Sequence, residues 1–84
     1  LDIDETRLYW TLVNWRNKMA KRSHYAYNWM VLGNITLYGV VEGSREDSFL
    51  LRDVSGLGGE GKKRRRYGAD IIKVLHDHHT NNPR

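Results

Sequence analysis

Five consecutive cations are the side chains best placed to do chemistry in this sequence: Lys62, Lys63, Arg64, Arg65 and Arg66. Adjacent like charges repel one another and add nothing to a hydrophobic core, which points to an anion outside the fold. The run opens a segment whose apolar residues recur at helical spacing, so it falls beside the free backbone N–H groups of a helix start. Side chains and helix dipole would act together on a phosphate. A solvated loop or a nuclear-import signal is the simpler interpretation.

A second group of cations precedes the middle of the chain. It consists of Arg16, Lys18, Lys21 and Arg22. On its own this group is typical of an ordinary polar helix face. Together with residues 62–66, and with a formal net charge of +4, it indicates a second surface for contact with nucleic acid.

Aromatic residues are frequent for 84 residues, with three Trp and five Tyr. Alternation along the central segment leaves some of Tyr27, Trp29 and Tyr38 uncovered, and exposed rings can stack on the bases of a single strand. The competing interpretation is that these rings fill the core of a small domain. An oligonucleotide-binding barrel would need five strands, and the sequence offers three.

Metal and enzyme chemistry find little support in the sequence. The absence of cysteine excludes disulfides and thiolate zinc ligands. Of His76, His78 and His79, only the first and last are neighbours on a helix, so a zinc site would need ligands from outside these residues. No nucleophile–base pattern and no phosphate-binding loop of the Gly-x4-Gly-Lys kind occurs. We therefore expect no catalytic residue, no metal and no cofactor.

Two helices are expected to flank the chain. Asp2 and Glu5 have the spacing of a capping box, and a stripe at helical spacing follows. Its members are Leu8, Leu12, Trp15 and Met19. In the last segment, one side of a second helix is formed by Tyr67, Ile71, Val74 with Leu75, and His78.

The middle of the chain predicts three antiparallel strands, at residues 25–32, 35–42 and 49–54. Aromatic and β-branched residues dominate these runs, and Gly33-Asn34 has the composition of a hairpin turn. The expected fold class is therefore α+β in the order α-β-β-β-α, with both helices on one face of the sheet.

We expect residues 1–84 to form one domain. Because the sequence does not begin with Met, we expect this domain to be part of a longer protein. The longest apolar run has four residues, so we expect no membrane span.

This order, with Gly59-Glu60-Gly61 and the basic run opening the final helix, resembles the double-stranded RNA-binding domain. Arg64 and Arg65 would match the lysine pair of that family's signature, Tyr67 its first alanine, and Ile71-Ile72 its later small pair. The sequence departs from the signature at Gly68, where the family carries a lysine, and the Gly33-Asn34 turn is shorter than the family's RNA-contacting loop.

The resemblance implies a non-catalytic module that binds double-stranded RNA by shape and phosphate contacts, with DNA as a further candidate. Its phosphate contacts would be residues 62–66, supported by the cations of residues 16–22. Such a module serves as an accessory domain of an RNase III-type or Dicer-like enzyme, in the nucleus or cytoplasm. The alternative is a protein-interaction or homodimerisation module that uses the aromatic face or an edge of the sheet.

Overall fold

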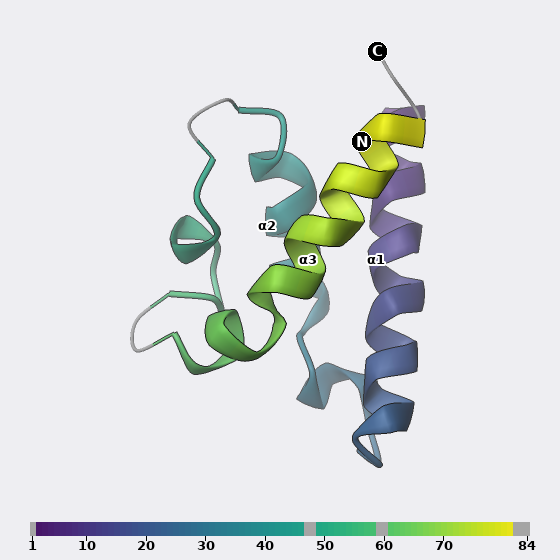
Figure 1. The fold of residues 1–84 in the computed structure, drawn as a ribbon, viewed down its shortest axis with the longest axis vertical. Coiled ribbons are helices and arrows are strands. Elements are labelled where there is room, and N and C mark those ends of the chain that lie inside the picture. Colours follow the sequence, from purple (N-terminus) through teal and green to yellow (C-terminus); the bar gives the residue numbers. More distant parts are fainter. Residues whose placement is uncertain (1, 47–48, 59–60, 82–84) are drawn as a thin grey trace.

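The computed structural model describes residues 2–46, 49–58 and 61–81, and over these ranges it contains helices and no strand. The three α-helices are α1 (Ile3–Arg22), α2 (Asn34–Gly43) and α3 (Lys62–Asn81). Short 3-10 turns, η1 (Asn28–Met30) and η2 (Leu51–Asp53), interrupt the two connections. Helices α1 and α3 run in opposite directions beside each other, and α2 packs against α1 (Figure 1). None of the helices in the described ranges is long and apolar enough to cross a membrane.

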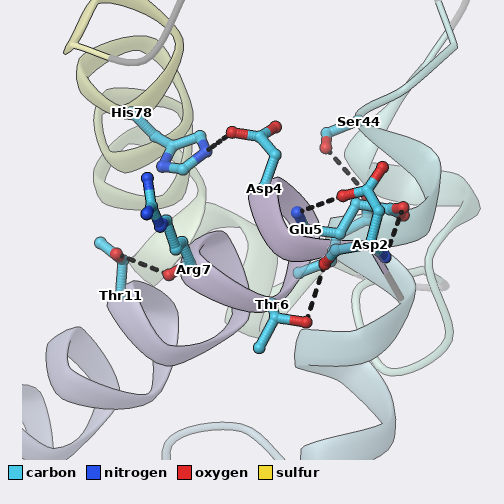
Figure 2. Close-up of polar contacts among 9 residues, drawn as sticks. Asp2, Asp4, Glu5, Thr6, Arg7, Thr11, Ser44 and His78 are labelled. Carbon is cyan, nitrogen blue, oxygen red and sulfur yellow. Dashed lines mark hydrogen bonds and ion pairs between the residues drawn. The ribbon is translucent and has the colours of Figure 1, made fainter.

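Helix α1 begins as the sequence predicts. The Glu5 backbone N–H donates to Asp2 Oδ1 over 2.8 Å, and the Asp2 N–H donates to Glu5 Oε1 over 3.3 Å, which completes a capping box (Figure 2). This exchange satisfies two backbone donors that a helix start leaves without partners. The apolar stripe then buries Leu8 and Leu12 in the core.

Helix α3 is also confirmed. Tyr67, Ile71, Leu75 and His78 are its buried side, at the spacing expected of an amphipathic helix. At the far end, His78 Nε2 lies 3.1 Å from Asp4 Oδ1, so the end of α3 is fixed to the start of α1 (Figure 2). The end of α3 therefore lies beside the start of α1, as Figure 1 shows.

The three predicted strands, at 25–32, 35–42 and 49–54, are wrong. Residues 35–42 lie within α2, which buries both Val40 and Val41 completely, whereas a strand would place these neighbours on opposite faces. Ile35, at the start of the same helix, is 78% exposed. The β-branched composition favoured strands, but packing against α1 decides the conformation here, because intrinsic preferences are weaker than tertiary burial.

The predicted hairpin at Gly33-Asn34 is instead the start of α2. The Leu37 N–H donates to the Gly33 carbonyl over 3.2 Å, which is the first turn of that helix. With no sheet in the described residues, the α+β class is wrong, and so is the resemblance to the double-stranded RNA-binding domain, whose fold is α-β-β-β-α. Gly59 and Glu60, which carried part of that resemblance, lie outside the described residues.

Candidate nucleic-acid interface

The basic run forms the first turns of α3, where Lys62, Lys63, Arg65 and Arg66 are exposed. Arg64 differs from them because it is half-buried and its Nη1 donates to the Leu57 carbonyl over 3.0 Å. It therefore fixes the segment that leads into α3. Four of the five predicted phosphate ligands remain available to a partner.

Arg66 connects this helix start with the end of α1. Its Nη2 donates to Ser23 Oγ over 3.4 Å, and its guanidinium carbon lies 5.9 Å from the centre of the Tyr25 ring and 5.4 Å from that of Tyr67. Burial, and then a hydrogen bond with Tyr25, raise the pKa of the Tyr67 hydroxyl, while the charge of Arg66 lowers it. The two groups of cations that the sequence singled out thus meet at one end of the antiparallel helix pair.

Three of the four α1 cations are exposed, namely Lys18, Lys21 and Arg22. Arg16 is buried, with 5% of its surface exposed, and its Nη1 donates to the Leu32 carbonyl (3.2 Å) and to Asn34 Oδ1 (2.6 Å). This side chain ties α1 to the start of α2, so we remove Arg16 from the set that could contact a phosphate.

The exposed members of the two predicted groups of cations are what we call the basic surface: Lys18, Lys21, Arg22, Lys62, Lys63, Arg65 and Arg66. Across the described residues, Arg45 forms an ion pair with Glu5, and His78 Nε2 contacts Asp4 Oδ1; neither pair involves the basic surface. Both pairs include the first turn of α1, at its opposite end. In the described ranges, none of the cations of the basic surface therefore forms an ion pair with a carboxylate.

A stacked pair of aromatic side chains lies in the connection that follows α1. Tyr27 and Trp29 are each 61% exposed, and their rings are nearly parallel, with centroids 5.8 Å apart and an interplanar angle of 13°. Between them, Asn28 Nδ2 donates to Asn17 Oδ1 on α1 over 3.0 Å. That bond holds the segment that carries the pair against α1 at Asn17, which also lines a hollow together with Asn14, Lys18 and Lys21.

Tyr38, the third aromatic residue that the sequence offered for base stacking, lies elsewhere. It is on α2, 45% exposed, beside carboxylates. The charge of Glu42 raises the pKa of its hydroxyl, with smaller contributions from desolvation and from Glu5. Such acidic surroundings would repel a phosphate, so Tyr38 is not part of the interface.

The three histidines do not form a metal centre with one another. His78 is buried against Asp4, while His76 and His79 are exposed. Among the ranges that the structure describes, no group of three or more His, Cys, Asp or Glu side chains converges as metal ligands would.

Comparison with known proteins does not assign this chain to a family. No protein-family model, curated protein or solved structure matches this chain. The function must therefore be argued from the basic surface and the aromatic pair. Sequence reasoning found the basic run and named both rings, but it missed their stacking. The signal for it was the spacing of Tyr27 and Trp29 across a single residue, Asn28, in a segment without a helical stripe.

Proposed function

We propose that this domain is a non-catalytic module that binds single-stranded nucleic acid. The observation that carries the proposal is the exposed, stacked Tyr27–Trp29 pair on a segment that the Asn28–Asn17 hydrogen bond joins to α1, the helix of Lys18, Lys21 and Arg22. Single-strand binding needs a positively charged surface for the backbone and aromatic faces for the bases. Both are present on adjoining parts of this protein.

The charge distribution supports the proposed contacts with the phosphates of the strand. The basic surface combines seven cations from two helices, and α3 has no acidic residue in its first turn. Counterions that such cations release from a nucleic-acid backbone favour binding, and they make it dependent on salt.

The aromatic pair supports the proposed stacking on the bases of the strand. A buried ring would pack in the core and could not contact a base, whereas most of the surface of Tyr27 and of Trp29 is exposed to solvent. A base in a duplex is already stacked on its neighbours, so an exposed ring favours unpaired bases. Whether the strand is DNA or RNA is an outcome of the experiment, and the nucleus and cytoplasm are the compartments that fit this role.

Fluorescence anisotropy with a labelled single strand of about 15 nucleotides, within the range that such surfaces cover, tests the proposal. DNA and RNA strands are compared with duplexes of the same sequence. We expect tighter binding to the single strands. Trp29→Ala should weaken it by about 1–3 kcal/mol, the value of one base–aromatic stack.

The matched control is Trp10→Ala, because Trp10 is 58% exposed but stands near the start of α1 and contacts Tyr9. This variant should bind as the unchanged protein does. Equal losses in both variants, or preference for duplexes, would contradict the proposal. If no nucleic acid binds while the protein self-associates in sedimentation, the interaction-module alternative gains support instead.

A further inference from the structure

A groove between α1 and α3 is separate from the aromatic pair. Its volume is about 270 Å³. Trp15, Met19 and Val74 are partly buried against the core and give the groove an apolar floor. Pockets for drug-sized ligands usually measure about 300–1,000 Å³, so this groove suits a smaller planar group.

Charged side chains of both signs form the rims of the groove. Lys18 and Arg22 come from α1, and Asp70 and Asp77 from α3, with Lys73 between the two carboxylates. All five are exposed. In the described part of the chain none of them takes part in an ion pair, so carboxylate acceptors and cationic donors are both available to a ligand.

We infer that this groove receives one unpaired base of the bound strand and prefers a base with an exocyclic amino group, such as cytosine. The base would lie against the apolar floor, as unpaired bases do against aromatic side chains. Its amino group would donate to Asp70 or Asp77, since carboxylates accept from the cytosine N4 amino group. Lys18, Arg22 and Lys73 would contact the flanking phosphates. Uracil presents a carbonyl oxygen at the same position, and a carboxylate repels it.

The path of the strand follows from Lys18, which lines both this groove and the hollow beside Asn17. A strand whose backbone lies along the hollow can therefore cross α1 at Lys18 and enter the groove. This inference rests on the proposed function and adds a preference among bases to it.

The test compares oligodeoxycytidine with oligodeoxyuridine of equal length, at mildly alkaline pH where cytosine is unprotonated. The two strands differ at the base only in the amino and carbonyl groups and the associated ring proton. We expect the protein to bind the cytidine strand about threefold more tightly or better, the value of one added hydrogen bond. The double variant Asp70→Asn/Asp77→Asn should bring the ratio close to one.

Two controls separate this result from simpler effects. Glu42→Gln removes an exposed carboxylate on α2 and should leave the ratio unchanged. Trp29→Ala should weaken both strands alike. Equal affinity for both strands in the unchanged protein, or a ratio that survives the double variant, would overturn the inference while the proposed function stands. Failure to bind either strand would overturn both.

Discussion

Arg66 on α3 donates a hydrogen bond to Ser23 Oγ at the end of α1, across 43 residues of sequence. The bond brings the first turns of one long helix to the last turn of the other, and so gathers two separate runs of cations. Because Arg66 also lies over the rings of Tyr25 and Tyr67, its position is held from several sides. The basic surface is thus a product of helix packing.

Removal of two cations from α1 should change the salt dependence of binding. Each phosphate contact on a single strand adds about 0.7 to the slope of log K against log salt. Lys18→Ala/Lys21→Ala should therefore lower the magnitude of that slope by about 1.4, in titrations between about 50 and 200 mM salt. Arg7→Ala, an exposed cation near the other end of α1, is the control and should leave the slope unchanged. An unchanged slope in the double variant would remove these lysines from the interface.

Arg16 should matter for stability. Its replacement by Ala removes two hydrogen bonds and leaves the Leu32 carbonyl and the Asn34 side chain without this partner. We expect the free energy of unfolding to fall by about 2–4 kcal/mol in chemical denaturation, as is usual when a buried polar network is broken. Lys18→Ala, on the surface two residues away, should change it by less than about 0.5 kcal/mol. Similar stabilities for the two variants would contradict the structural role of Arg16.

Gly61 should be intolerant of a side chain. Its φ of +72° is in the left-handed region, and an added Cβ would lie 2.6 Å from Arg64 Nη2. Gly61→Ala should lower the free energy of unfolding by about 1–2 kcal/mol. Gly33→Ala is a matched comparison because Gly33 has a φ of −74° and open space around it. A change of less than about 0.5 kcal/mol is expected there.

Stability should fall in alkaline solution through Tyr67. Its pKa is raised above the ordinary value of 10.0, so folding favours the neutral phenol. That contribution is complete below the unfolded-state pKa and is lost as the pH rises through the folded-state pKa. Denaturation curves above pH 10 should show a steeper loss for the unchanged protein than for Tyr67→Phe, which cannot ionise. Tyr27→Phe, an exposed control, should follow the unchanged protein; identical curves for all three would contradict this role.

The two long helices could be predicted from the sequence because each carries its own local signals. The Asp2–Glu5 spacing marks the start of α1, and the stripes of both helices repeat at 3.6 residues. The middle could not be predicted in this way. Residues 35–42 fit an alternating strand almost as well as a helix. The structure buries the neighbours Thr36 and Leu37 together, and Val40 and Val41 together, which an alternating strand would place on opposite faces.

The basic surface was predictable only in part for a similar reason. A run of cations is visible in the sequence, but the partners of Arg16 are 16 and 18 residues away and that of Arg64 is seven residues away. No local pattern shows which cations form hydrogen bonds within the protein and are therefore not available to a ligand. The segment that carries Tyr27 and Trp29 is likewise joined to α1 by the hydrogen bond from Asn28 to Asn17, between residues 11 apart in the sequence.

The most direct measurement is a two-dimensional NMR titration of the labelled protein with a single-stranded oligonucleotide. We expect the Trp29 indole signal to shift together with backbone signals of residues 14–22 and 62–66, while the Trp10 indole signal and the signals of α2 stay unchanged. Shifts centred on α2 and the start of α1, with residues 27–29 and 62–66 unaffected, would contradict the account.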